Sequence, residues 1–130
     1  MAVTLRQARA EYLALRERQV SQRTYDTERL VITKFIKYAN AHFVRTNDMK
    51  VNQLKPTHME NFFYDPQRGQ SVRVKASTFN TRRIIMGNFC TFLTRRGYAP
   101  GGLMDMVVPR KVVQEEKTTV LKVKLEPEAK

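Results

Sequence analysis

The sequence is poor in the side chains that build metal centres and disulfides. Its 130 residues include one cysteine, Cys90, and two histidines, His42 and His58. A lone cysteine excludes an internal disulfide framework and a cysteine-rich zinc site. No apolar run approaches the roughly 20 residues of a membrane span, and the stretch from Leu5 to Arg18 is too charged for a signal peptide. We therefore expect a soluble intracellular protein without a metal, a cofactor or a membrane partner.

Motifs of nucleotide-binding loops and hydrolases are lacking as well. Gly69 and Gly101-Gly102 do not lie in the context of a glycine-rich phosphate loop, and no nucleophile elbow occurs. His42-Phe43-Val44-Arg45 spells H-x-x-R, but one short match in a loop carries little weight. We expect Cys90 in the core and His58 at the surface. The absence of a catalytic constellation favours a binding module over an enzyme with a small-molecule substrate.

Acidic residues are scarce, and the deficit is uneven along the chain. There are 24 Lys and Arg against 12 Asp and Glu, a formal net charge of +12. Residues 1–100 hold 18 basic and 7 acidic side chains, whereas residues 101–130 hold 6 and 5. The interval between Asp65 and Asp105 has no acid and contains Arg68, Arg73, Lys75, Arg82, Arg83, Arg95 and Arg96. This pattern predicts a phosphate-facing surface, with nucleic acid as the first partner to test. The alternative is a generally basic protein that its charge keeps soluble.

Apolar spacing predicts four helices, with no convincing strand before residue 100. A Thr4–Gln7 capping box predicts a helix over 4–18, and Ser21 is expected to cap a second helix that ends near residue 41. Pro56 suits the first position of a short third helix. Ser77 or Thr78 is expected to begin a long fourth helix, which Gly97 stops in the left-handed conformation. The predicted inward-facing residues are Leu5, Ala8, Tyr12, Leu15, Thr24, Glu28, Val31, Ile32, Phe35, Tyr38, Ala39, Met59, Phe62, Phe63, Phe79, Ile84 or Ile85, Met86, Phe89, Phe92 and Leu93.

Glycines mark two further features. Gly87 lies inside the fourth predicted helix, where it costs about 1 kcal/mol relative to Ala, and we interpret it as the site of a close helix crossing. Gly101-Gly102 reads as a hinge, after which Thr118–Leu125 alternates as a strand does. We predict a helical domain over 1–100 and a flexible linker or tail over 101–130. The alternative is a tail whose strand pairs with a partner or with its own copy.

Polar and basic residues gather at two of the helix starts. The predicted DNA contacts are Ser21, Gln22, Arg23 and Thr24 at the second helix, and Arg73, Lys75, Ser77, Thr78, Asn80, Thr81, Arg82 and Arg83 around the start of the fourth. Helix N-termini present free N–H groups and a partial positive charge, which suit phosphate. Short polar side chains there can reach backbone oxygens or base edges. The alternative for Ser21 and Ser77 is helix capping alone.

The ordered series of these motifs is similar to a known family. It runs through Thr4-Leu5 to Tyr12-Leu13, Ser21-x-x-Thr24 to Phe35, Leu54-Lys55-Pro56, Ser77-Thr78-x-Asn80-x-x-Arg83, Phe89-Cys90-Thr91-Phe92-Leu93 and Gly97-Tyr98-x-Pro100. Over roughly residues 4–100, it resembles the core-binding, SAM-like N-terminal domain of tyrosine recombinases and phage integrases. The resemblance implies an all-α, four-helix bundle that clamps one face of duplex DNA, with its second and fourth helices near the major groove. The two helix starts named above would take that role.

The resemblance stops at Pro100. Only 30 residues follow it, whereas the family's catalytic domain, with its arginines, its H-x-x-R box and its tyrosine nucleophile, would come after a linker. His42-x-x-Arg45 lies in the wrong domain. We therefore expect no catalysis by this chain, which reads as a piece of a longer integrase or as a short protein that keeps the DNA-binding half.

The resulting hypothesis is double-stranded DNA binding of the core-site-clamping kind used in site-specific recombination. We expect the protein in the cytoplasm with the nucleoid, with self-association or a recombinase partner acting through residues 101–130. One alternative is a stand-alone DNA-binding regulator. The other is an RNA-binding basic protein, which would need exposed aromatic side chains.

Overall fold

A computed structural model of the chain describes residues 3–44, 49–64 and 75–109. Its elements are α1 (Leu5–Glu17), α2 (Gln22–His42), the 3-10 turn η1 (Val51–Gln53), α3 (Pro56–Tyr64) and α4 (Ala76–Arg95). Within the described ranges there is no strand, only an isolated antiparallel bridge between Thr4 and Lys50. The prediction of an all-α fold with four helices is confirmed. None of the described helices is long and apolar enough to cross a membrane.

The helix ends follow from local side-chain chemistry. The Thr4 hydroxyl accepts a hydrogen bond from Gln7 N–H at 3.1 Å, and Gln7 Oε1 accepts one from Thr4 N–H at 2.9 Å, which confirms the capping box. Pro56 is the first residue of α3, as predicted. Gly97 has φ +75° just after α4, the left-handed stop. The predicted start of α4 was wrong by one or two residues, because α4 begins at Ala76.

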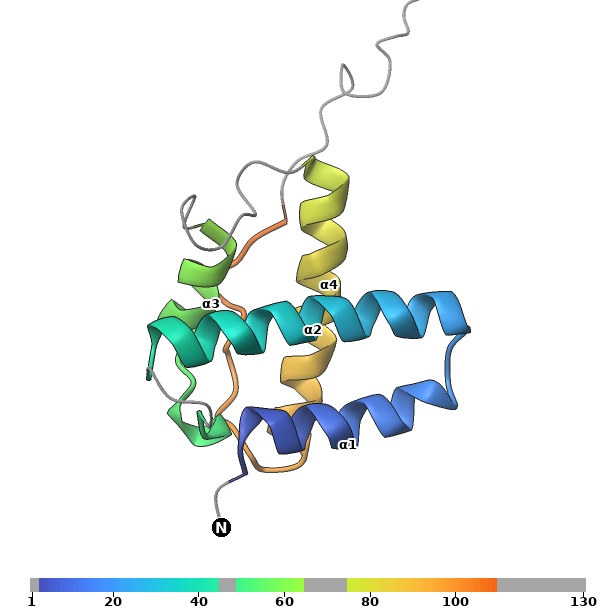
Figure 1. The fold of residues 1–130 in the computed structure, drawn as a ribbon. Coiled ribbons are helices and arrows are strands. Elements are labelled where there is room, and N and C mark those ends of the chain that lie inside the picture. Colours follow the sequence, from blue (N-terminus) through green and yellow to red (C-terminus); the bar gives the residue numbers. More distant parts are fainter. Residues whose placement is uncertain (1–2, 45–48, 65–74, 110–130) are drawn as a thin grey trace, which may run out of the picture.

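The helices form two layers that cross (Figure 1). α1 and α2 lie side by side and run in opposite directions, joined by a short connection. α4 crosses them, and its first half extends beyond α2 on the side away from α1, where α3 also lies. This arrangement leaves the N-terminal half of α4 projecting from the helix pair.

Aromatic residues fill the space where the layers meet. Phe35 of α2 and Phe89 of α4 are both fully buried. Tyr12 of α1 contacts the rings of Phe89 and Phe92, with centroids 5.3 and 5.1 Å apart. Phe63 of α3 contacts Phe79 of α4 at 5.4 Å. The predicted core is confirmed except at Leu15 and Thr24, which are exposed, whereas Leu13 is buried. Of the two alternatives Ile84 and Ile85, Ile85 is the buried one.

Gly87 is not at a close helix crossing, and that prediction was wrong. A Cβ built on Gly87 meets no atom within 4 Å, apart from its own helix backbone and chain neighbours. The residue is half-buried and lines a groove between α4 and residues 101–105. An alanine therefore has room at this position.

The chain after α4 turns back onto the helices. We call residues 101–109 the C-terminal strap; it passes between α3 and α4 towards the start of α4 (Figure 1). Its Leu103 and Val107 are 2% and 1% exposed and belong to the hydrophobic core. The expectation that little of the tail joins the core is therefore wrong for the strap. The domain boundary at residue 100 stays a prediction, and Thr118–Leu125 lies outside the described residues.

Candidate nucleic-acid interface

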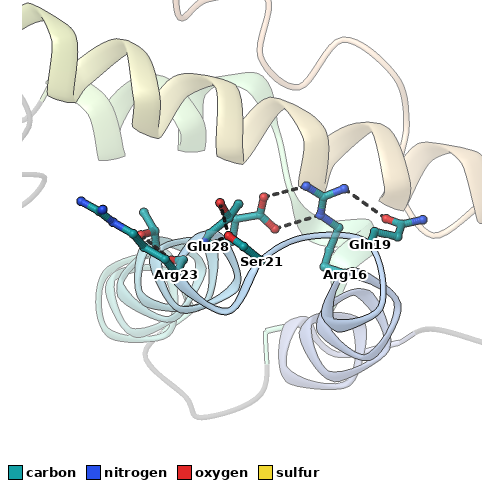
Figure 2. A network of polar contacts seen from close by, with 7 residues as sticks. Arg16, Gln19, Ser21, Arg23 and Glu28 are labelled. Atoms are coloured by element: carbon teal, nitrogen blue, oxygen red, sulfur yellow. Dashed lines mark hydrogen bonds and ion pairs between the residues drawn. The ribbon is translucent and has the colours of Figure 1, made fainter.

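The start of α2 presents four exposed polar residues, Ser21, Gln22, Arg23 and Thr24. Ser21 is the N-cap, since its Oγ accepts a hydrogen bond from Thr24 N–H at 3.3 Å and donates one to the Thr24 hydroxyl at 3.2 Å. Gln22 donates to Asp26 Oδ1 at 2.9 Å. Arg23 points outward, away from the α1–α2 junction (Figure 2). Capping thus accounts for Ser21, and Arg23 is the cation that this start offers to a ligand.

A buried ion pair holds the start of α2 against α1. Arg16 Nε and Nη2 donate to the two Glu28 carboxylate oxygens at 2.9 and 2.8 Å, and Nη1 donates to Gln19 Oε1 at 3.1 Å (Figure 2). The Glu28 side chain is 5% exposed and that of Arg16 is 22% exposed. Two parallel hydrogen bonds fix orientation as well as distance. Burial, and next the nearby Glu28 charge, raise the pKa of Tyr12 to about 12, so this tyrosine stays neutral.

The start of α4 presents hydroxyl and basic groups. Lys75, Ser77, Thr78 and Thr81 are exposed, and Asn80 is half-buried. The Thr81 hydroxyl donates to the Ser77 carbonyl at 3.0 Å. Lys75 is the N-cap and contributes no side-chain cap, and the predicted capping alternative for Ser77 is wrong because Ser77 lies inside the helix. The hydroxyl of Ser77 therefore lies at the surface in the first turn, where the N–H groups have no partner within the helix.

Arg82 and Arg83 differ from the freely exposed residues of this start. Both are half-buried. Arg83 Nε donates to the Val107 carbonyl of the strap at 3.0 Å. No pattern in the sequence distinguishes the two arginines, yet Arg83 is tied to the strap by a hydrogen bond that is not found for Arg82 among the described contacts. Arg73 lies outside the described residues.

The two starts do not lie next to each other. α2 begins at the end of the molecule where α1 ends, whereas α4 begins at the tip of the half that projects past α2 (Figure 1). A single ligand that reaches both starts must therefore be extended.

Carboxylates are distributed unevenly over these two surfaces. α4 runs for 20 residues without one. On the first turns of α2, Arg16 pairs with Glu28, while Asp26 is exposed, keeps its charge and accepts a hydrogen bond from the neutral Gln22 amide. The start of α4 is therefore the more cationic of the two, which suits a polyanion.

The other reactive side chains do not form a second site. Burial raises the pKa of the Cys90 thiol to about 12, as expected for an inert core cysteine. His58 is half-buried and stacks on Phe43 with ring centroids 4.1 Å apart, so it lies at the surface only in part. Among the described residues, no group of three or more His, Cys, Asp or Glu could hold a metal ion.

Sequence reasoning missed the contacts that link distant residues. Arg16 and Glu28 are 12 positions apart, and Arg83 and Val107 are 24 apart. The Arg16–Glu28 contact could have been suspected from the sequence, because Glu28 lies on an otherwise apolar stripe and a buried carboxylate requires a nearby cation. Nothing in the sequence marked Val107 as a partner of Arg83.

Comparison with known proteins identifies the fold. No family model matches the sequence, and no curated protein sequence matches it. The structure is similar to the crystal structure of the N-terminal domain of a phage integrase/site-specific recombinase from Haloarcula marismortui, with a TM-score of 0.70. The match covers 85% of this chain and 99% of that chain, at 17% sequence identity. The chain has the fold of an integrase N-terminal domain.

This result confirms the fold that the sequence resemblance implied. The likeness is to an N-terminal domain, without a catalytic domain. In the integrase N-terminal fold of this chain, the two predicted contact regions are the exposed start of α2 and the projecting start of α4.

Proposed function

We propose that the protein binds double-stranded DNA through the starts of α2 and α4, as the DNA-clamping domain of a recombinase does. The observation that carries this proposal is the projection of a carboxylate-free α4 beyond α2, on the side away from α1 (Figure 1). An extended polyanion can touch both starts, and the free N–H groups at each start suit its phosphates. The proposed contacts are Ser21, Gln22, Arg23, Thr24, Arg73, Lys75, Ser77, Thr78, Asn80, Thr81 and Arg82.

Duplex DNA is favoured over single-stranded RNA by the placement of the aromatic residues. The chain has 7 Phe and 5 Tyr, and all of them are buried or half-buried. Recognition of unpaired bases uses exposed rings as stacking platforms. We therefore place the protein with DNA, in the cytoplasm and associated with the nucleoid.

The salt dependence of binding tests the proposal. With about 4–6 phosphates contacted, the affinity for a labelled duplex should fall with a log–log salt slope of about −4 to −5. Arg23→Ala and Arg82→Ala should each flatten the slope by about 0.9. Arg6→Ala is the matched control, because Arg6 is equally cationic but lies at the start of α1.

Fluorescence anisotropy between about 50 and 300 mM KCl gives these slopes. Equal competition by heparin and by duplex DNA, with no preference for the duplex, would replace the proposal with nonspecific polyanion binding. Stronger binding to single-stranded RNA would favour the RNA-binding alternative.

We also propose that this chain by itself does not cleave DNA. Tyr98 lies near the basic side chain of Arg96, but its hydroxyl donates to both Glu11 carboxylate oxygens, at 2.8 and 3.1 Å. This hydrogen bond, the largest cause, raises the pKa of Tyr98 and opposes formation of a phenolate nucleophile. Incubation with a nicked suicide duplex should give no covalent adduct on a denaturing gel. An adduct that disappears in Tyr98→Phe would contradict this expectation.

A further inference from the structure

The C-terminal strap is anchored to the projecting half of α4 by polar and apolar contacts. Arg83 Nε donates to the Val107 carbonyl at 3.0 Å. The Val108 N–H donates to the Tyr64 hydroxyl of α3 at 3.2 Å. The Val107 side chain between these two hydrogen bonds is 1% exposed. Val107 and Val108 thus tie this end of the strap to α4 and α3 by hydrogen bonds.

This half of α4 has little other support. It extends past α2, so the α1–α2 pair does not cover it (Figure 1). Its N-cap, Lys75, provides no side-chain hydrogen bond. Phe79 packs on the rings of Phe63 and Tyr64 of α3, with centroids 5.4 and 5.7 Å apart. The strap adds a contact further along the helix, at Arg83.

Arg83 is less available to a phosphate than a freely exposed arginine, because it already makes a hydrogen bond within the protein. Arg83 is half-buried, as Arg82 is, but its Nε already donates to a backbone carbonyl of its own chain. A charged donor on a part-buried carbonyl makes a stronger hydrogen bond than a neutral one. The residue is therefore placed to hold the strap against the helix.

We propose that Arg83 is a positioning residue: through Val107 it fixes the start of α4 for DNA binding, and it does not itself neutralise a phosphate. This inference rests on the proposed function and replaces the sequence-based assignment of Arg83 as a DNA contact. It also gives the strap a role in binding, although the strap carries no basic side chain among residues 101–109.

A neutral substitution that keeps a donor distinguishes the two possible roles of Arg83. In Arg83→Gln the amide nitrogen stands the same number of bonds from Cα as Nε does, so the donor to Val107 is kept while the charge is lost. For a positioning residue, Arg83→Ala lowers duplex affinity about three- to tenfold at an unchanged salt slope, and Arg83→Gln recovers affinity to within about twofold. For a phosphate ligand, both variants flatten the slope by about 0.9 and Gln gives no recovery. The second result would overturn the proposal.

Tyr64→Phe tests the other anchor without changing any charge. It removes the acceptor of Val108 N–H but keeps the ring that packs on Phe79. We expect a loss of duplex affinity at an unchanged slope. Tyr98→Phe is the matched control, because it also removes one tyrosine hydroxyl but acts on Glu11 of α1. Equal affinities for Tyr64→Phe and the wild type would contradict the role of the strap.

Amide hydrogen exchange without DNA distinguishes failure of this inference from failure of the proposed function. Arg83→Ala and Tyr64→Phe should speed exchange in the first turns of α4, whereas Arg83→Gln and Tyr98→Phe should not. If the wild type binds no duplex, the proposed function fails. The amide exchange rates of the variants then show by themselves whether the strap stabilises the start of α4. Unchanged amide exchange in both Arg83→Ala and Tyr64→Phe would overturn the proposal that the strap fixes the start of α4.

Discussion

His58 shows how one side chain can serve as a helix cap only while it is neutral. Its Nδ1 accepts a hydrogen bond from Lys55 N–H at 3.1 Å, just before α3. Burial, and next the charge of Lys55, lower the pKa of His58 below its usual value. Protonation would turn the acceptor into a donor and would place a second positive charge beside Lys55. The folded state therefore favours neutral His58.

The stability of the protein should depend on pH through His58. Because the folded pKa lies below the unfolded value of about 6.5, the contribution is complete above that pH and is lost as the pH falls below it. We expect the urea midpoint to fall between about pH 7 and pH 5, and His58→Gln, which keeps an acceptor at this position, to weaken that dependence. His42→Gln removes an exposed histidine and serves as the control. An identical pH dependence in wild type and His58→Gln would contradict this role.

At the scale of the element, the glycines around α4 have opposite roles. Gly87 lies inside the helix with open space around a built Cβ. Gly97 follows the helix with φ +75°, where an L side chain clashes with its own backbone. The same residue type therefore weakens the helix at one position and terminates it at the other.

Alanine substitutions should separate these two roles. Gly87→Ala should raise the free energy of unfolding by about 0.5–1 kcal/mol, since alanine has the higher helix propensity and the site has room. Gly97→Ala should lower it by about 1 kcal/mol because of left-handed strain. Urea unfolding of both variants measures the difference. A loss of stability in Gly87→Ala would contradict the expectation that this position has room for a methyl group.

At the scale of the whole molecule, the strap extends the folded unit past the last helix. Leu103 and Val107 are nearly fully buried, and the Gly102 φ of +79° allows the turn that brings them back. The hydrogen bond from Thr94 Oγ1 to the Pro100 carbonyl, at 3.2 Å, holds the beginning of this turn. We therefore expect the smallest stable chain to end after the strap.

Two truncations test the extent of the folded unit. A chain of residues 1–109 should keep the unfolding free energy of the full chain to within about 1 kcal/mol, because it retains the described core. A chain of residues 1–100 should lose about 3–6 kcal/mol, from two aliphatic side chains at about 1.5–3 kcal/mol each. Thermal or urea unfolding checks both. A 1–100 chain as stable as the full chain would show that the strap contributes no stability.

The candidate site was predictable from the sequence where its contacts join residues that are close in sequence. The start of α2 was located from residues within a few positions of each other, Ser21 and Thr24, because caps join i to i+3. The start of α4 was predicted one or two residues late, because its N-cap, Lys75, provides no side-chain hydrogen bond. Their separation at two parts of the molecule was not predictable, since it depends on the angle at which α4 crosses α2. The different surroundings of Arg82 and Arg83 likewise arise only when the strap folds back.

The sequence by itself determined the number of helices, most of their ends and most of the core. These properties depend on local spacing, as with the Thr4–Gln7 capping box and the left-handed Gly97. Tertiary structure decided the partner of Glu28, the exposure of Leu15 and Ile84, and the burial of Val107. A helical period leaves two or three residues near each edge of an apolar stripe, and only the neighbouring helix decides which of them is covered. The two buried residues of the strap, Leu103 and Val107, show no helical or strand period, so only their packing into the tertiary core could select them.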